Sequence, residues 1–548
     1  MNQDRIVGSA SAELVGLKHD LPPDARASSP ASPLLLRPIG SVLRSVESLF
    51  DRAFGERVNP WRSLGALGFY LYWIVAVSGI YIYIFFDTSV VGAYDSVERL
   101  TREQWYAGGI MRSLHRYASD AFVVVMFLHL ARELVSGRYY NFRWFSWVSG
   151  VPLIWLAYLA GIGGYWLVWD QLAQFSAVAT AEWLDFLPIF GEPIVRNFLT
   201  PASINDRFFS LLVFAHIGIP LVLLLGMWIH IQRISRARVL PPRALALGTL
   251  AMLLAASLLR PALSHDIAEL SSVPESLQLD WFYLFVHPLM YGSSPGQLWA
   301  LACAFTMLLL VVPLLPHPKP KAVAEVSPAN CNGCARCFAD CPYAAVIMRP
   351  HPDKPGHQLA SVLTDLCAGC GICAGACPSS TPFRSDEQIV SGIDMPQLSI
   401  AALRAKLERG LATFGGETKV VVFGCDCAAD VRALAGPDTT ALSLPCTGML
   451  PPSFVEYAIR DGADGVMLTG CVECAYRLGN RWVEERLNGA RQPLLRANVS
   501  RERVRVVWAG TEQEAHVAQE LALFRRTLRE LGRPAAHARS KRKVGHRA

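Results

Sequence analysis

The chain has 548 residues, of which 52% are hydrophobic and only 18% are charged. Soluble proteins carry about 25% charged residues, and one hydrophobic core rarely extends beyond about 250 residues. The composition therefore excludes a disordered chain and predicts several domains, one of them in a membrane. The formal net charge is +6, and residues 533–548 carry six basic side chains. We interpret this tail as a disordered basic segment beside anionic lipid headgroups, and no nucleic-acid binding is expected.

Two kinds of sequence are joined end to end. Twelve of the 14 tryptophans lie before residue 300, whereas 13 of the 14 cysteines lie after residue 330. The cysteines form tight C-x-C and C-x-x-C groups, a spacing that favours metal sites over a disulfide framework.

The N-terminal half begins with two different segments. Residues 1–33 are rich in Ala, Ser, Pro and Asp and lack the apolar core of a secretory signal, which predicts a flexible cytoplasmic start. In 34–54, apolar residues recur at helical spacing between arginines, which predicts a helix on the membrane surface.

Six later runs are long and apolar enough to cross a bilayer: 66–86, 115–135, 150–169, 208–231, 244–263 and 297–315. Arginines gather in the connections after the second and fourth runs, and acidic residues in those after the third and fifth. The arginine-rich connections are therefore predicted to be cytoplasmic. Six crossings return the chain to the cytoplasm, so we expect a protein of the inner membrane whose cysteine-rich domains are cytoplasmic.

The second and fourth runs each contain two histidines 14 residues apart: His115 and His129, and His216 and His230. Fourteen residues return to the same helix face after a rise of about 21 Å. Because the two helices run in the same direction, His115 pairs with His216 and His129 pairs with His230. Two stacked bis-histidine sites are what two b-type haems require. The alternatives are a zinc site, which needs four ligands around one point, and a proton relay.

Glycines and arginines accompany these histidines. Gly65 and Gly79 in the first run, and Gly150 and Gly164 in the third, repeat the 14-residue interval. We expect them to leave room for a flat macrocycle, although alone they would indicate helix packing. Arg112 and Arg132 lie one turn outside the histidines of the second run, where they could bind haem propionates.

Several of these segments resemble the quinol-oxidising cytochrome b of bc1 and b6f complexes. They are R-S-L-H (112–115), H-L-A-R (129–132), G-Y-W-L-V-W-D-Q (164–171), A-H-I-G-I-P (215–220) and the proline pair 241–242. The resemblance covers about 60–320. It implies a four-helix haem bundle, quinone sites next to the haems and a homodimer.

Two positions differ from that family. Its Pro-Glu-Trp-Tyr motif at the outer quinol site is replaced by Leu279-Asp280-Trp281-Phe282, and Val168 stands where the family has proline. Asp280 could still accept a proton from the quinol, although its side chain is shorter than that of the family's glutamate. We therefore expect a single quinone site, on a membrane side that the sequence leaves open.

Eight cysteines form two matching runs. Cys331, Cys334, Cys337 and Cys341 precede a proline, and the same spacing recurs at Cys367, Cys370, Cys373 and Cys377. This is the spacing of bacterial two-cluster ferredoxins, in which the fourth cysteine of each run ligates the other cluster. We expect one [4Fe–4S] cluster on Cys331, Cys334, Cys337 and Cys377, and the second on Cys367, Cys370, Cys373 and Cys341. A zinc ribbon would need only four cysteines.

Five further cysteines follow predicted strands. The strands are 419–424, 441–445, 465–469 and 504–508, and helical stretches alternate with them, which predicts a small parallel α/β domain. Cys425, Cys427, Cys446, Cys471 and Cys474 lie at the carboxyl ends of three of these strands, where open α/β sheets bind ligands. A third metal centre is expected there, and catalytic thiols or a disulfide are the alternatives.

The segments around these five cysteines resemble the delta-type iron–sulfur subunit found with methyl-viologen-reducing hydrogenases and heterodisulfide reductases. They are G-C-D-C-A-A-D (424–430), L-P-C-T-G (444–448) and the run from 462 to 480. The resemblance implies one [2Fe–2S] cluster that exchanges electrons with a flavin in a partner subunit. The family's C-x-x-C is C-x-C here, so the sequence does not select four ligands from the five cysteines.

Together these patterns predict a multidomain membrane protein with an all-α haem bundle, a ferredoxin-like α+β domain and a parallel α/β domain. The expected segments are a flexible start (1–33), a membrane domain (34–318), a two-cluster ferredoxin domain (323–385), a helical connector (386–415), an α/β domain (416–532) and a basic tail (533–548).

The expected function is electron transfer between the quinone pool and a cytoplasmic heterodisulfide-reductase-like flavoprotein. The path would run through two haems b, two [4Fe–4S] clusters and one [2Fe–2S] cluster. One alternative is the quinone-reducing membrane subunit of a hydrogenase or formate dehydrogenase. Another is a membrane anchor whose haems are structural.

Overall fold

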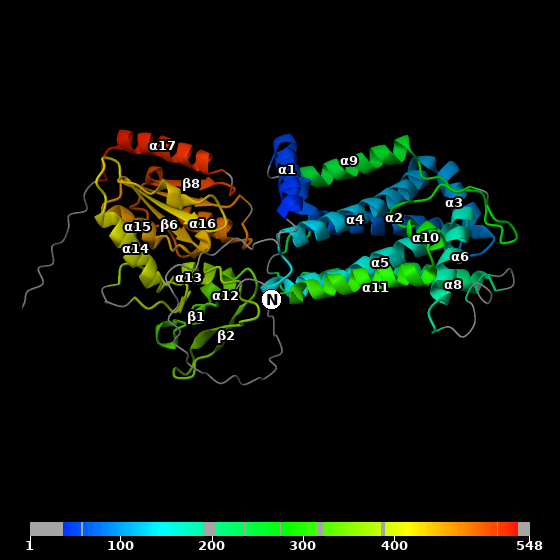
Figure 1. The fold of residues 1–548 in the computed structure, drawn as a ribbon, viewed down its shortest axis with the longest axis horizontal. Coiled ribbons are helices and arrows are strands. Elements are labelled where there is room, and N and C mark those ends of the chain that lie inside the picture. Colours follow the sequence, from blue (N-terminus) through cyan, green and yellow to red (C-terminus); the bar gives the residue numbers. More distant parts are fainter. Residues whose placement is uncertain are drawn as a thin grey trace, which may run out of the picture.

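The computed structural model describes residues 37–55, 58–189, 194, 199, 203–234, 237–274, 276–315, 322–384, 389–472, 474–511 and 513–534. The predicted flexible start, most of the linker at 316–322 and nearly all of the basic tail lie outside these residues. Figure 1 shows two parts side by side. One is a bundle of long helices formed by 37–315, called the helical bundle, and the other is a mixed helix and sheet region formed by 322–534, called the C-terminal part.

Six long helices make up most of the helical bundle. Helix α2 packs along α4 and α5 packs along α8, while α9 lies against α4 and α11 against α5 (Figure 1). Their bounds are α2 Leu64–Phe85, α4 Ile110–Val135, α5 Trp144–Val168, α8 Asp206–His230, α9 Arg243–Leu259 and α11 Pro295–Val311. Three N-terminal ends are defined by polar caps: Asn59 before the 3₁₀ turn that leads into α2, Asn205 before α8 and Ser294 before α11.

Among the residues that the structure describes, four helical segments are long and apolar enough to span a membrane: Pro60–Phe85, Asn141–Val168, Asp206–His230 and Pro295–Leu314. They agree with four of the six predicted runs. Helix α4 has 26 residues but carries several charged side chains, and α9 has only 17 residues, so six crossings stay a prediction. Large apolar side chains lie exposed on the outer faces of these helices, for example Val77 on α2, Leu221 on α8 and Met307 on α11. Such a surface is typical of contact with lipid.

Shorter helices close the two ends of the helical bundle (Figure 1). At the end far from the C-terminal part lie α3 Gly92–Arg102, η3 Trp105–Gly109, α6 Gln171–Asp185 and α10 Val286–Gly292. At the near end stands α1 Arg37–Phe54, within the predicted surface helix, followed by η2 Pro60–Ser63. Asp51 of α1 accepts a hydrogen bond from Arg62 of η2 at 2.7 Å, and this bond lowers the pKa of the Asp51 carboxyl. The turns η4 Asn141–Arg143 and η5 Val312–Leu314 also lie at this end.

The C-terminal part begins with two small antiparallel sheets. Strand β1 Glu325–Val326 pairs with β4 Ile393–Asp394, and β2 Val346–Pro350 pairs with β3 Gln358–Val362. Between them lie η6 Pro328–Asn330 and two short helices, α12 Arg336–Asp340 and α13 Ile372–Ala376. Helices α12 and α13 pack against each other.

A four-stranded parallel sheet follows, in the order β6-β5-β7-β8, as the alternation of strand and helix patterns predicted. The strands are β5 Val420–Cys425, β6 Thr439–Leu444, β7 Gly465–Gly470 and β8 Val504–Trp508. The helices are α14 Ile400–Ala412, α15 Ser453–Arg460, α16 Gly479–Leu487 and α17 Glu514–Leu531, with the 3₁₀ turns η7 Val431–Leu434, η8 Thr447–Met449 and η9 Arg501–Arg503. Between β5 and β6, where the sequence predicts a helical stretch, the structure has only the turn η7.

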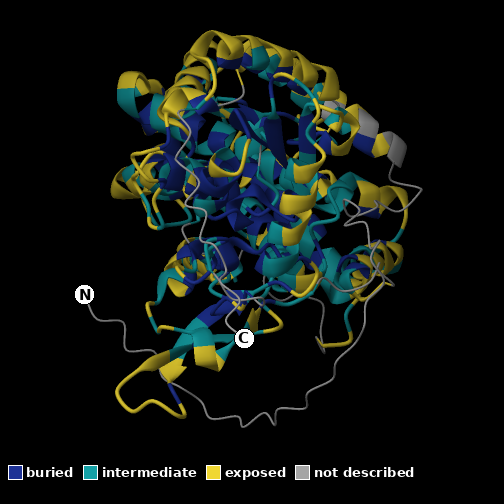
Figure 2. Ribbon diagram, turned by 90° about the vertical axis from the view of Figure 1, so that its left-hand side faces the viewer, coloured by how far each residue is buried: buried dark blue, intermediate teal, exposed yellow. Residues whose placement is uncertain are grey.

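Successive residues of the central strand β5 point to opposite faces of the sheet, as strand geometry requires. Val420 and Val422 pack with α17, whereas Val421 and Phe423 belong to a larger core on the other face. That larger core also contains Leu403 of α14, and it continues into the small sheets through other buried side chains. Figure 2 shows this buried centre enclosed by helices with exposed outer faces. The predicted connector helix is thus part of one hydrophobic core that joins the two cysteine-rich regions.

A buried ion pair reinforces this junction. Arg486 of α16, which is 0% exposed, donates to Oδ2 of Asp340 in α12 at 2.6 Å and to the carbonyl of Gly448 at 2.7 Å. Arg491 donates to the other carboxylate oxygen of Asp340 at 2.7 Å and stacks on the ring of Trp482. Because buried charges are stable only when paired, these groups hold α12 and α16 in one arrangement.

Replacement of Arg486 by methionine should lower the stability of the C-terminal part by about 3 kcal/mol, because Asp340 loses one of its two cations in a buried site. Native-state hydrogen exchange of the β5 amides in the full chain measures this free energy. Arg432→Met is the matched control, since Arg432 and Asp430 form an exposed pair that should contribute less than about 1 kcal/mol. Equal effects of the two variants would contradict the prediction.

Candidate redox centres

The four membrane histidines form two pairs in the helical bundle. The rings of His115 in α4 and His216 in α8 have centroids 6.3 Å apart. Metal–imidazole bonds are about 2 Å long, so two imidazoles on opposite sides of one metal ion have centroids roughly 6 Å apart. Nδ1 of His115 lies 2.9 Å from the carbonyl oxygen of Val75, and Nδ1 of His216 lies 3.0 Å from that of Ala160. These hydrogen bonds leave Nε2 of each ring for a metal, as is usual for ligating histidines.

The second pair lies 14 residues further along the same helices. Nδ1 of His230 lies 3.2 Å from the hydroxyl oxygen of Ser149 in α5. His129 and His230 each lie 14 residues after the first histidine of their helix, a rise of about 21 Å, which brings both to a second level of the helical bundle. Each level thus has one histidine from α4 and one from α8. The pair His129 and His230 lies closer to the turn η4, which contacts the C-terminal part.

Each of the four glycines faces one of these histidines. An added Cβ would lie 2.9 Å from His115 at Gly79, 2.8 Å from His216 at Gly164, 3.1 Å from His230 at Gly150 and 3.6 Å from His129 at Gly65. A side chain at Gly79 or Gly164 would displace the imidazole. The glycines thus keep the space beside the imidazoles clear, and the residues present fit a haem at each level.

The two predicted propionate ligands are buried among other polar groups. Arg112 donates to the hydroxyl oxygens of Thr101 and Ser264, and Glu98 lies 3.4 Å away. Arg132 lies 3.9 Å from Glu47 of α1. Both guanidinium groups are placed at the ends of α4, one near each histidine pair.

Asp280 lies in a buried polar cluster that sequence reasoning only partly found. Its carboxylate pairs with Arg116 at 2.9 Å and accepts a hydrogen bond from the hydroxyl of Tyr165. Arg116 also lies 3.4 Å from Asp120, one turn further along α4. Arg116 follows His115 directly, so the cluster adjoins the first histidine pair. Asp120 and Arg116 could have been found from the sequence, because charged side chains within an apolar run are functional candidates.

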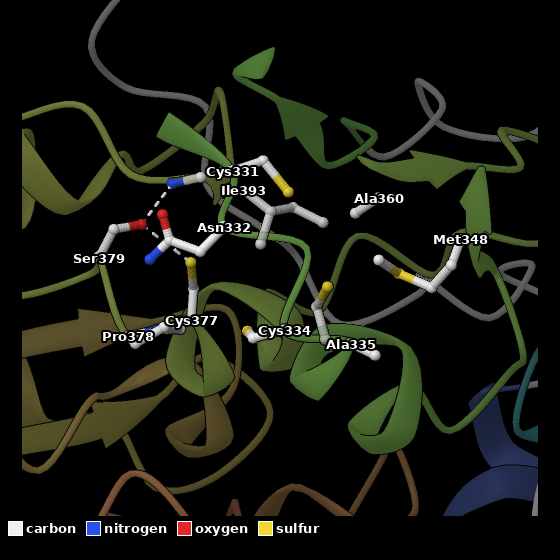
Figure 3. A pocket seen from close by; sticks show the side chains of 12 residues that line it. Cys331, Asn332, Cys334, Ala335, Met348, Ala360, Cys377, Pro378, Ser379 and Ile393 are labelled. Atoms are coloured by element: carbon white, nitrogen blue, oxygen red, sulfur yellow. Dashed lines mark hydrogen bonds between the residues drawn. The ribbon is translucent and has the colours of Figure 1, made fainter. Parts of the chain in front are cut away.

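The eight cysteines of the two matching runs line two separate cavities. Cys331, Cys334, Cys337 and Cys377 line one, and Figure 3 shows the first, second and fourth of them around it. Cys341, Cys367, Cys370 and Cys373 line the other. Each cavity thus brings together three cysteines of one run and the fourth cysteine of the other run. Ser379 supports the first set, since its Oγ lies 3.0 Å from Sγ of Cys377 and accepts a hydrogen bond from the Gly392 amide.

The donor chemistry of these cavities fits iron–sulfur clusters. Burial raises the pKa of the Cys337 thiol to about 12 and raises that of Cys373 as well. Such thiols become thiolates only when they bind a metal, so cluster insertion must release protons. Among the described residues, no three His, Cys, Asp or Glu side chains converge as ligands of a single ion would. A cluster gives each thiolate its own iron.

The last five cysteines of the chain gather at the carboxyl ends of β5, β6 and β7. Sγ of Cys425 lies 3.9 Å from Sγ of Cys471, and an added Cβ at Gly479 would lie 2.2 Å from Sγ of Cys446 and 3.1 Å from that of Cys474. A hydrogen bond from the Cys427 thiol lowers the pKa of Cys425 to about 4. A hydrogen bond from Cys446 lowers the pKa of Cys474. The reciprocal hydrogen bonds to Cys474 and Cys425 raise the pKa of Cys446 and Cys471. Two of these thiols are therefore favoured as thiolates, the form that binds metal, and their two partners keep their protons until a metal binds.

Three family models match the chain in order. Residues 49–237 match cytochrome b/b6/petB, 330–381 match the 4Fe-4S dicluster domain and 420–532 match the methyl-viologen-reducing hydrogenase, delta subunit. The chain is thus a membrane electron-transfer protein in which a cytochrome b domain, a 4Fe-4S dicluster domain and a delta-subunit-like domain follow one another. Cytochrome b implies haem b, and the dicluster domain implies [4Fe–4S] clusters.

One solved structure that is similar to this chain is named hyperthermophilic respiratory Complex III. It is 19% identical, with a TM-score of 0.40, and the match covers 50% of this chain and 80% of that one.

The variant Gly164→Leu should lower the haem content of the purified protein, because its side chain would occupy the space beside His216. Gly163→Leu is the matched control, since a Cβ at Gly163 meets no atom within 4 Å. Haem per chain is measured from the pyridine haemochrome spectrum. Equal haem contents in the two variants would show that the glycine does not border the macrocycle.

Proposed function

We propose that this protein transfers electrons between the quinone pool and a cytoplasmic heterodisulfide-reductase-like flavoprotein. Two haems b, on His115 with His216 and on His129 with His230, would form the membrane path. Two [4Fe–4S] clusters and one [2Fe–2S] cluster would continue it. The observation that carries the proposal is the convergence of two glycine-faced histidine pairs and three cysteine groups in one chain.

The quinone site is proposed beside Asp280. A quinol that becomes a quinone releases two electrons and two protons. The electrons would leave one at a time to the haem on His115 and His216. The Asp280 carboxylate would accept one proton, and the second would pass to water at this end of the helical bundle. Arg116 and Tyr165 hold this carboxylate in place. Arg116 directly follows His115 in α4, so the haem would lie close to this cluster. In the opposite direction the same groups would supply protons to a quinone.

The five cysteines at the sheet edge are proposed to hold the [2Fe–2S] cluster. All five lie within a small region formed by the ends of three strands, and four of them are the ligands that such a cluster needs. The match to a delta subunit supports this assignment. The flavin partner would dock near this sheet edge.

For the arrangement in the membrane, we propose six crossings of the inner membrane. Helices α4 and α9 would cross with the four apolar segments, because α4 has 26 residues and faces α2 and α9 inside the bundle. The C-terminal part would then be cytoplasmic, and the cytochrome b domain would form a homodimer, surrounded by membrane lipid.

The delta-subunit match also favours a second candidate, the quinone-reducing membrane subunit of a hydrogenase or formate dehydrogenase complex. In that case electrons would enter at the five-cysteine centre and leave at the quinone site. A membrane anchor with structural haems is the third outcome, and it would show no haem reduction by quinol or from the iron–sulfur side.

Asp280→Asn should slow haem reduction by a quinol about 100-fold, because general-base catalysis by a positioned carboxylate contributes a factor of this size. Stopped-flow absorbance of the b haem in the purified full chain measures the rate. Asp95→Asn, on the exposed surface of α3, is the control. If wild-type haems accept no electrons from quinol, the quinone link is wrong. If the wild-type haems are reduced by quinol and those of Asp280→Asn are reduced at the same rate, the proton-acceptor role is wrong.

Gly479→Val should remove the third centre, because its side chain would occupy the position of the Cys446 thiol. We expect about two iron atoms fewer per chain and the loss of one electron paramagnetic resonance (EPR) signal. Gly415→Val is the control, as a Cβ there meets no atom within 4 Å. Unchanged iron and EPR signals in Gly479→Val would exclude a cluster on these cysteines.

A further inference from the structure

Contacts between described residues join the helical bundle to the C-terminal part, and three of them lie beside cysteine groups. The Phe142 ring of η4 lies 4.4 Å from the ring of Tyr343. Arg143 donates to the carbonyl oxygen of Ala475 at 3.0 Å, and Arg233 lies 3.7 Å from Asp365. Tyr343 is two residues after Cys341, Ala475 follows Cys474, and Asp365 is two residues before Cys367.

Tyr343 occupies a buried position shared by two cysteine groups. It is 5% exposed and packs in one apolar cluster with Cys370, Cys446 and Tyr476. Phe142, Cys341 and Cys474 pack at the edge of the same cluster. Side chains from the helical bundle, the Cys341 cavity and the five-cysteine centre therefore meet around one tyrosine ring.

The backbones of the two cysteine regions also touch at this place. A Cβ at Gly375 in α13 would lie 2.2 Å from the carbonyl oxygen of Gly448 in η8, the turn that follows Cys446. A Cβ at Gly371 would lie 2.8 Å from the side chain of Met449. Only a residue without a side chain allows such an approach. The Cys341 cavity and the five-cysteine centre are thus direct neighbours.

The Cys331 cavity is differently placed. None of the 12 residues that line it belongs to the apolar cluster around Tyr343. None of them takes part in the three contacts with the helical bundle described above. Its rim opens outward, because Cys334 is exposed and Phe338, next to Cys337, is 50% exposed.

We propose that the cluster on Cys341, Cys367, Cys370 and Cys373 is a branch point, and that the cluster on Cys331, Cys334, Cys337 and Cys377 is a side arm. This inference rests on the proposed function. Electrons cross between the haem on His129 and His230 and the branch-point cluster at the Phe142–Tyr343 contact. From the branch point one arm leads to the five-cysteine centre, and the other leads to the exposed rim at Cys334.

The branched order replaces a linear order in which both cubane clusters lie between haem and the five-cysteine centre. Each step moves one electron: the donor centre is oxidised by one electron, the acceptor is reduced by one, and no bond to the protein forms or breaks. Tyr343 acts as a positioning residue, because its ring holds the turn η4 against the cluster region.

The decisive variant is Cys334→Ser in the full chain, with quinol as the reductant and freeze-quench EPR as the measurement. We expect the signal of the Cys331 cluster to be lost and the five-cysteine centre to be reduced as fast as in the wild type. If the five-cysteine centre were no longer reduced while the branch-point cluster was still visible by EPR, the branched order would be wrong.

A second variant tests the contact without removing a cluster. Tyr343→Leu should slow reduction of the clusters and the five-cysteine centre while haem reduction by quinol keeps its rate. Tyr343→Phe should restore the fast rate, because the Tyr343 hydroxyl has no hydrogen-bond partner among the described residues. Phe338→Leu, a matched loss of a ring beside the other cavity, should leave this rate unchanged.

The outcomes separate the two proposals. If Phe338→Leu slows the transfer and Tyr343→Leu does not, electrons cross at the other cavity and the branch point is wrong. If quinol reduces no haem in the wild type, the proposed function fails instead. In that case dithionite reduction of the same variants still tests whether the five-cysteine centre equilibrates with the branch-point cluster alone.

Discussion

The close approach of a helix backbone to each half-buried imidazole is the constraint on which the helical bundle depends. A polar ring in an apolar medium needs a partner for both nitrogens, and the bundle supplies one through Val75, Ala160 or Ser149. The other nitrogen is left toward a space that the glycines keep empty. This need explains the pairing of the helices. Helices α4 and α8 each carry two histidines, and the facing helices α2 and α5 carry glycines opposite them.

The C-terminal part obeys a different constraint, which is the satisfaction of buried charge. Asp340, Arg486 and Arg491 make a network that is stable only when all three are present. The network connects the helix carrying Cys337 with the helix after Cys474, so it fixes the distance between centres that belong to separate sequence motifs. One-electron transfer depends on such fixed separations, and a shared hydrophobic core supplies the rigidity.

Local patterns predicted much of this molecule because its ligands are periodic. The 14-residue histidine interval, the repeated cysteine runs and the alternation of strands with helices all depend on residues close in sequence. The contacts that sequence reasoning missed are long-range. Phe142 meets Tyr343, and Asp340 meets Arg486, across about 150 to 200 residues of chain. No periodicity signals such pairs, since each partner taken alone resembles an ordinary surface or core residue.

The place of α14 carries a practical consequence. The helix looked like a spacer between two modules, yet Ile400, Leu403 and Leu407 are fully buried beneath the sheet. If the gene were divided within this helix, one product would expose the apolar surface that α14 covers. The other product would carry part of an amphipathic helix with no core to pack against. Expression of the C-terminal part on its own must therefore begin before residue 322 and keep both cysteine-rich regions together.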